Sequence, residues 1–106
     1  MTNKIKNLVK EIKDYLIQHY RTGIKSVILY GSYARGDSTE NSDVDVMIVI
    51  SDDLNPMGVE KRLSDFLFEL LLKENELISV IAIPESIFEN YRSPFILNTK
   101  EEGVVV

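Results

Sequence analysis

The chain has 106 residues, of which 44% are hydrophobic, so it has room for one folded domain and one core but no second folded unit. Its formal net charge of −5 disfavours stable binding to nucleic acid, which depends largely on lysine and arginine contacts with phosphates. The chain lacks cysteine, which excludes disulfides, and it has a single histidine, which argues against a zinc site. It also has no apolar run of membrane-spanning length, so we expect one soluble, cytoplasmic domain over residues 1–106.

The first third of the chain predicts a helix and then a short strand. Apolar residues recur at helical spacing from Ile5 to Tyr20, and Gly23 is expected to end that helix. Residues 26–30 form a β-favouring run that stops at Gly31. We therefore expect a strand that leads into a glycine-containing loop.

The middle of the chain predicts a second strand and a long helix. Residues 36–42 are almost wholly polar and rich in turn formers, whereas residues 44–50 are apolar on both faces, as in a strand covered on both sides. Asn55 and Pro56 are a typical helix start, and apolar residues then recur three and four apart as far as Leu71.

The last third predicts a third strand over residues 78–83 and two short helices, which begin at Pro84 and at Pro94. Gly103 is expected to end the last helix before a valine tail. The order α-β-α-β-α-β-α indicates an α/β (α+β) fold in which helices flank one sheet.

Two short motifs stand at the ends of neighbouring predicted strands, Gly31-Ser32 after the first and Asp43-Val44-Asp45 before the second, with ten residues between them. Gly31 has no Cβ, so a phosphate can approach its backbone, and Ser32 adds a hydroxyl at a helix start, which favours anions. Asp43 and Asp45 project from one face of their strand, and such carboxylates suit Mg²⁺ that is shared with substrate phosphates. The pattern predicts a phosphate-binding turn beside two magnesium ligands.

Together these motifs would position a triphosphate for in-line attack, which indicates nucleotidyl transfer. Arg35 follows the glycine turn, and its guanidinium is a candidate phosphate ligand, although an arginine at such a place is as often solvated. Taken alone, an Asp-x-Asp pair is typical of a solvated strand start and a Gly-Ser pair of a plain turn. The spacing and the flanking strands favour the catalytic interpretation.

Residues 31–36 (Gly-Ser-Tyr-Ala-Arg-Gly) and 42–45 (Ser-Asp-Val-Asp) resemble the signature of the DNA polymerase β-like nucleotidyltransferase superfamily. More closely, they resemble the MNT-type minimal nucleotidyltransferases, as does the ending from Pro94 to Gly103, so the resemblance covers nearly the whole chain. It implies a mixed three-stranded sheet flanked by helices, ATP as donor and two Mg²⁺ ions. It also implies a partner, a HEPN-domain toxin that the MNT antitoxin adenylylates.

This superfamily usually places a third carboxylate on the third strand, as a metal ligand or general base, and the sequence departs from that pattern. Ser79 stands where an aspartate is expected, whereas Glu76 lies at the entrance of the strand and is long enough to reach back. We take Glu76 as the candidate third metal ligand and catalytic residue beside Asp43 and Asp45. If Glu76 faces solvent instead, the acceptor has no base from this chain and catalysis is weak or absent.

Three functions stay open. The first is an antitoxin enzyme that transfers AMP, or another nucleoside monophosphate, to a hydroxyl of a HEPN partner. The second is a non-catalytic nucleotide-binding module that neutralises its partner by occlusion. The third, a transferase for a small-molecule hydroxyl such as that of an aminoglycoside, ranks lower because the chain lacks the extra helical domain of such relatives.

The surface that would meet a partner is expected on the first helix or at Phe95, Ile96 and Leu97, although core packing is favoured for those three. A homo-oligomer is left open, and neither membrane attachment nor a stable nucleic-acid complex is expected.

Overall fold

The computed structural model describes residues 3–106, and the side chains of residues 4–106. Its sheet has four strands in the order β3-β2-β1-β4. β1 (Ile24–Tyr30) is antiparallel to β2 (Val44–Ile50) and to β4 (Val104–Val105), whereas β2 and β3 (Ile78–Pro84) are parallel. The predicted α+β class with a mixed sheet is confirmed.

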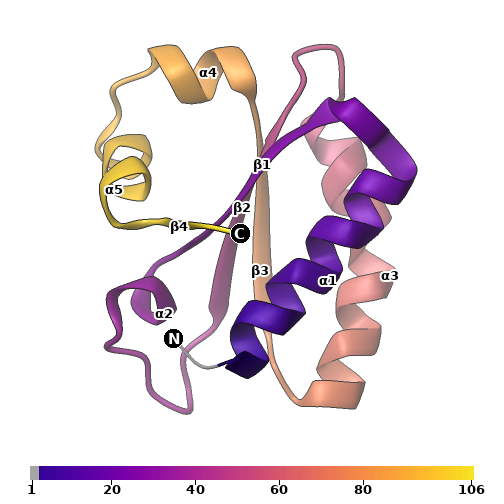
Figure 1. Cartoon of the computed structure of the whole chain (residues 1–106), viewed down its shortest axis with the longest axis vertical. Coiled ribbons are helices and arrows are strands. Elements are labelled where there is room, and N and C mark those ends of the chain that lie inside the picture. Colours follow the sequence, from indigo (N-terminus) through magenta and orange to yellow (C-terminus); the bar gives the residue numbers. More distant parts are fainter. Residues whose placement is uncertain (1–2) are drawn as a thin grey trace.

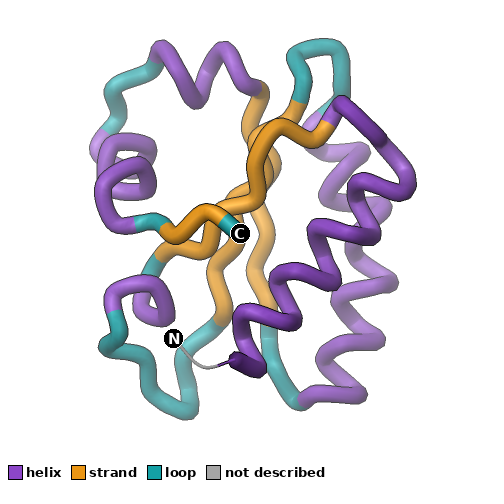
Figure 2. The backbone as a smooth tube through the Cα atoms, viewed as in Figure 1, coloured by secondary structure: helices purple, strands orange, loops and turns teal. Residues whose placement is uncertain are grey.

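Helices join the strands: α1 Asn3–Tyr20, the 3-10 helix η1 Arg21–Gly23, α2 Ser32–Arg35, α3 Pro56–Glu74, α4 Glu85–Asn90 and α5 Pro94–Glu102. α1 and α3 cover one face of the sheet, and α4 and α5 lie on the other side (Figure 1). The loop between α2 and β2 lies at the end of the sheet where β1 finishes and β2 begins (Figure 2). Among residues 3–106, no helix combines the length and the apolar character that a membrane span requires.

The core consists of two apolar clusters, one on each face of the sheet. The larger joins α1 and α3 to the sheet, and the residues that α1 buries there are Ile5, Leu8, Val9, Ile12 and Leu16. The smaller lies toward α4 and is made of Ile28, Met47, Val49 and Ile83. Because successive strand residues point to opposite faces, β2 contributes to both clusters, which explains why it is apolar on both sides.

The long helix α3 begins as the sequence predicts. The Asn55 side-chain oxygen accepts hydrogen bonds from the backbone N–H groups of Met57 (2.9 Å) and Gly58 (3.3 Å), while Pro56 occupies the first turn. A cap of this kind satisfies donors that a helix leaves without partners at its start.

The number of strands differs from the prediction, because residues 104–106 do not form a mere tail. Two of them form β4, which pairs with the outer edge of β1. The Val106 N–H donates to the Val27 carbonyl (2.9 Å), and Lys13 of α1 donates to the Val106 carbonyl (2.8 Å). A strand this short cannot show an alternation of apolar and polar residues, and the strand with which it pairs lies far away in the sequence.

Candidate active site

β1 ends in a turn that requires glycine. Gly31 has φ 76° and ψ −154° directly before α2, and Gly36 ends α2 with φ 82°. The Gly31 carbonyl accepts hydrogen bonds from the N–H groups of Ala34 and Arg35, both at 3.1 Å. The first N–H groups of a helix have no partner within it, so the start of α2 at Ser32 offers donors to a phosphate.

The acidic motif lies beside this turn. Asp43 directly precedes β2, and Asp45 is the second residue of that strand. Across the antiparallel ladder Asp45 pairs with Tyr30, the residue before Gly31. A Cβ added to Gly31 would overlap the Asp45 Oδ2 and lie 3.3 Å from the Cγ. The two motifs that the sequence connects only by spacing are therefore in contact.

The electrostatics of Asp45 favour a bound cation. Its pKa is raised above the ordinary value, first because burial removes water from the carboxyl group and then because Asp43 is nearby, while the charge of Arg35 acts in the opposite direction. The pKa of Tyr30 is also raised, by burial and then by the charge of Asp45. A partly buried carboxylate that is repelled by an exposed neighbour is stabilised in its charged form by a bound cation. This donor set fits magnesium, which proteins commonly hold through one or two carboxylates together with substrate phosphates.

Arg35 is the last residue of α2, and its guanidinium forms ion pairs with two acidic residues. Its Nε lies 3.2 Å from the Asp37 Oδ2, and its Nη1 lies 3.6 Å from the Glu102 Oε2 on α5. The side chain is 45% exposed, so these pairs are open to exchange with a ligand. Contact between Arg35 and a phosphate stays a prediction.

The role of Glu76 as third metal ligand stays a prediction, and its carboxylate has a partner on α1. Its Oε1 lies 3.5 Å from the Lys4 Nζ, and the same amine donates to the Glu74 carbonyl at 3.0 Å. Among residues 3–106, no three histidine, cysteine, aspartate or glutamate side chains gather in a way that could hold a metal ion. Glu76 is thus paired with a residue of α1 that is distant in the sequence, and its charge, like that of Asp43, raises the pKa of the Tyr33 hydroxyl.

Ser79 occupies the position at which the superfamily resemblance predicts an acidic residue. It is the partner of Asp45 in the parallel ladder and is exposed. The third carboxylate is therefore missing at a place where there is room for one.

Sequence reasoning missed Tyr33, whose hydroxyl lies close to Glu76 and Asp43. Burial raises the pKa of its hydroxyl, and so do the charges of Glu76 and Asp43, which places this hydroxyl in the field of both carboxylates. Tyr33 lies within the glycine motif, and that position is the one signal that could have identified it.

The expectation that residues 95–97 pack in the core is right for one of them. Ile96 is buried, whereas Phe95 is 42% and Leu97 45% exposed. Consecutive residues of a helix point in different directions, so three neighbours on α5 cannot all face the sheet.

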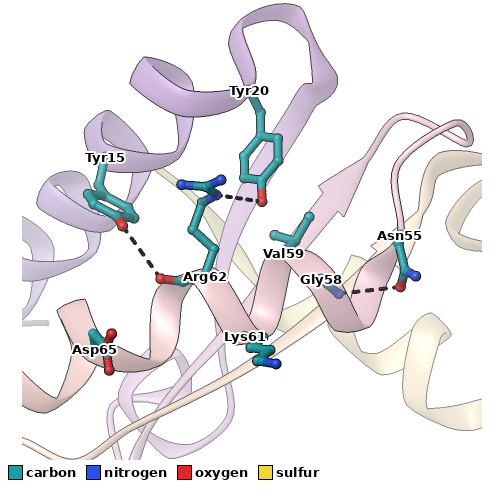
Figure 3. A pocket seen from close by; sticks show the side chains of 8 residues that line it. All are labelled: Tyr15, Tyr20, Asn55, Gly58, Val59, Lys61, Arg62 and Asp65. Atoms are coloured by element: carbon teal, nitrogen blue, oxygen red, sulfur yellow. Dashed lines mark hydrogen bonds between the residues drawn. The ribbon is translucent and has the colours of Figure 1, made fainter.

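A separate groove of about 580 Å³ lies between the end of α1 and the start of α3 (Figure 3). Arg62 crosses it, donating from Nε to the Tyr20 hydroxyl at 3.1 Å, and the Tyr15 hydroxyl donates to the Arg62 carbonyl at 3.4 Å. The residues that line it are Tyr15, Tyr20, Asn55, Gly58, Val59, Lys61, Arg62 and Asp65. None of the predicted phosphate or metal ligands is among them, so this groove is distinct from the site at Gly31.

Comparison with known proteins decides the family. The sequence matches the family described as nucleotidyltransferase domain over residues 9–106. The chain belongs to this family. It is 39% identical over 99 residues to a protein of Methanocaldococcus jannaschii that is named a protein adenylyltransferase, and the match covers 92% of this chain and 93% of that protein.

Two solved structures share the fold of this nucleotidyltransferase. A minimal nucleotidyltransferase superposes with a TM-score of 0.62 at 18% identity, over 96% of this chain and 95% of that chain. A toxin-antitoxin structure with AMP-PNP superposes with a TM-score of 0.60 at 14% identity, over 91% of this chain and 70% of that chain. The predicted MNT-type minimal nucleotidyltransferase, and with it the prediction of an enzyme, is confirmed.

Proposed function

We propose that this nucleotidyltransferase transfers AMP from ATP to a hydroxyl group of a partner protein, and that the partner is a HEPN-domain toxin which the modification neutralises. The observation that carries the proposal is the contact of Asp45 with the Gly31 turn, with Asp43 two residues before Asp45. The protein acceptor is supported by the name of the M. jannaschii relative and by the toxin-antitoxin pair among the fold neighbours. Residues 1–106 would act in this as one unit.

Asp43 and Asp45 would hold magnesium jointly with the phosphates of ATP, and their mutual repulsion supports a cation at this place. Bound magnesium would neutralise phosphate charge and stabilise the attacking and leaving oxygens of an in-line displacement. The family resemblance implies two ions. Two carboxylates fit that number only if phosphate oxygens and water supply the remaining ligands.

In the proposed reaction the acceptor oxygen bonds to the α-phosphorus while the bond from that phosphorus to the bridging oxygen breaks. Pyrophosphate leaves with the electron pair, and the hydroxyl proton passes to water. Ser32 and the N–H groups at the start of α2 would hold the phosphates, and Arg35 would exchange its carboxylate partners for a phosphate oxygen.

The test is transfer of label from α-³²P-ATP with Mg²⁺ to the product of the neighbouring gene. Asp43→Asn combined with Asp45→Asn should lower the rate by more than the roughly 10–100-fold that loss of an outer-shell metal partner costs. A matched control, Asp14→Asn with Asp65→Asn, removes the same charge from exposed positions on α1 and α3 and should retain transfer. Undiminished labelling by the first double variant would overturn the proposal.

A second function is favoured by one observation, the absence of a third carboxylate beside Asp45 among the described residues. In that case the chain binds a nucleotide and neutralises its partner by occlusion, without transfer. Tight complex formation and partner inhibition that survive the double substitution, with no label transferred, would support it. A small-molecule acceptor has no such observation in its favour.

A further inference from the structure

A small hollow adjoins the turn at Gly31 on the side of the sheet that α5 covers. It measures about 100 Å³. Its lining residues are Tyr30, Gly31, Phe95, Asn98, Thr99 and Glu102. Sites for whole ligands are typically about 300–1,000 Å³, so this hollow has room for only one part of a nucleotide.

The hollow presents one aromatic ring in a fixed orientation. Phe95 is 42% exposed, yet its ring packs edge-on against Tyr30, with 5.5 Å between the centroids and 74° between the ring planes. Tyr30 is anchored in β1 and half-buried. An exposed ring that is already held by a neighbour loses little freedom when a flat ligand stacks on it.

Among the polar side chains of the hollow, Asn98 on α5 is free to contact a ligand. The Thr99 hydroxyl donates to the Phe95 carbonyl at 2.9 Å, and Glu102 pairs with Arg35. Within the described part of the chain the Asn98 side-chain amide has no hydrogen-bond partner. A carboxamide offers both a donor and an acceptor, which matches the mixed edge of a nucleobase.

Gly31 belongs both to this hollow and to the phosphate and metal site, since the Asp45 carboxylate lies against it. A nucleotide with its phosphates at Ser32 and the aspartates can therefore extend its other end toward α5. We propose that the hollow binds the base of the donor nucleotide, with Phe95 against the face of the ring and Asn98 at its edge. This inference rests on the proposed function and adds to it the element that selects the nucleotide.

The test separates the base from the phosphates by calorimetric titration of the full chain, in Mg²⁺, with ATP and with inorganic tripolyphosphate. Phe95→Ala should weaken ATP about 10-fold, in the range expected for one stacked base, and leave tripolyphosphate binding unchanged. The matched control is Leu97→Ala, on the same helix and 45% exposed but outside the hollow, which should bind both ligands as the wild type does.

Asn98→Ala provides a second, conservative variant, because Asn98 is exposed and its truncation breaks no hydrogen bond of the described chain. It should change the ratio of the ATP and GTP dissociation constants about 5-fold or more. Equal weakening of ATP by Phe95→Ala and Leu97→Ala, or an unaltered ratio in Asn98→Ala, would overturn the base pocket while leaving the phosphate site intact. If the wild type bound neither ATP nor tripolyphosphate, the proposed function itself would fall.

Discussion

Ser79 and Asp45 are partners on parallel strands, and only Asp45 carries a carboxylate. Neighbouring strands lie roughly 4.8 Å apart, so a carboxylate at residue 79 would stand beside the existing acidic pair. Because Ser79 is exposed, the larger side chain should fit without disturbing the core. We expect Ser79→Asp to bind Mg²⁺-ATP more tightly and to raise the rate of transfer about 10-fold.

The control for this gain is Ser64→Asp, which adds the same charge at an exposed position of α3, away from the site. Rates of label transfer at several Mg²⁺ concentrations measure the effect. If both variants behaved alike, or Ser79→Asp only lost stability, the position would not be the missing third ligand.

Gly31 permits the contact on which the site depends. A methyl group there would overlap the Asp45 carboxylate, and an L-residue at φ 76° costs about 1–2 kcal/mol in addition. Gly31→Ala should therefore displace Asp45 and lower transfer about 100-fold, the loss that a misplacement of roughly 1 Å can produce. Magnesium titration followed by the thermal midpoint would show whether the metal affinity falls with the rate, and full activity would contradict the geometry.

At this scale the sequence predicted what depends on near neighbours. Asp43 and Asp45 stand on either side of the first residue of β2, so their proximity could be predicted from their spacing alone. The orientation of Glu76 could not, because it depends on Lys4, whose approach follows from the packing of α1. A charged side chain near a strand end has no local preference strong enough to resist such a partner.

Among the elements, α5 and β4 are joined at a single crowded residue. A Cβ at Gly103 would overlap the Thr99 carbonyl oxygen and lie 2.6 Å from the Ile28 Cγ2, and the backbone oxygen cannot move cheaply. Gly103→Ala should separate α5 from the sheet and destabilise the fold by about 1–3 kcal/mol, as overpacking typically does.

Thermal unfolding monitored by circular dichroism measures this loss, which should lower the midpoint by roughly 5–15 °C for a domain of this size. Gly58→Ala is the matched control, since its Cβ would meet only ordinary contacts within the first turn of α3. That change should be neutral or slightly stabilising, because alanine is the better helix former. Equal midpoints for the two variants would show that the crowding at Gly103 is relieved at no cost.

A comparison of α3 with β4 shows where sequence reasoning about elements succeeds and where it fails. The start of α3 depends on adjacent residues, Asn55 as the cap and Pro56 in the first turn, so it could be predicted to the residue. β4 has two residues, and its existence depends on an open edge of β1 that only the folded sheet provides. No pattern within Val104–Val105 distinguishes it from a tail.

In the molecule as a whole, the metal-free site opposes folding. The pKa of Asp45 is raised in the folded chain, so the native state keeps its proton to a higher pH than the unfolded state does. Stability linked to Asp45 is therefore present below the ordinary pKa of about 3.8 and is lost as the pH rises through the raised value. Without metal, Asp45→Asn should unfold about 1–3 °C above the wild type near neutral pH.

This difference should shrink as the pH is lowered toward about 4, where the wild-type carboxyl also becomes protonated. Thermal midpoints of both proteins in a chelator, measured across that range, test the prediction, and Asp14→Asn controls for the change in net charge. Added Mg²⁺-ATP should then stabilise the wild type and not the variant. A constant difference at all pH values would show that Asp45 ionises as in the unfolded chain.

The close contact between Gly31 and Asp45 also constrains how this protein can evolve. Whether a substitution at one of these two residues is tolerated depends on the side chain at the other, so the effects of the two substitutions on activity should not be additive. Once Asp45 is lost, a side chain at residue 31 meets no carboxylate and only the backbone strain opposes it. A lineage that abandons transfer and keeps only a binding role would thus be expected to lose the aspartate first and the glycine afterwards, and the order of loss would record the change of function.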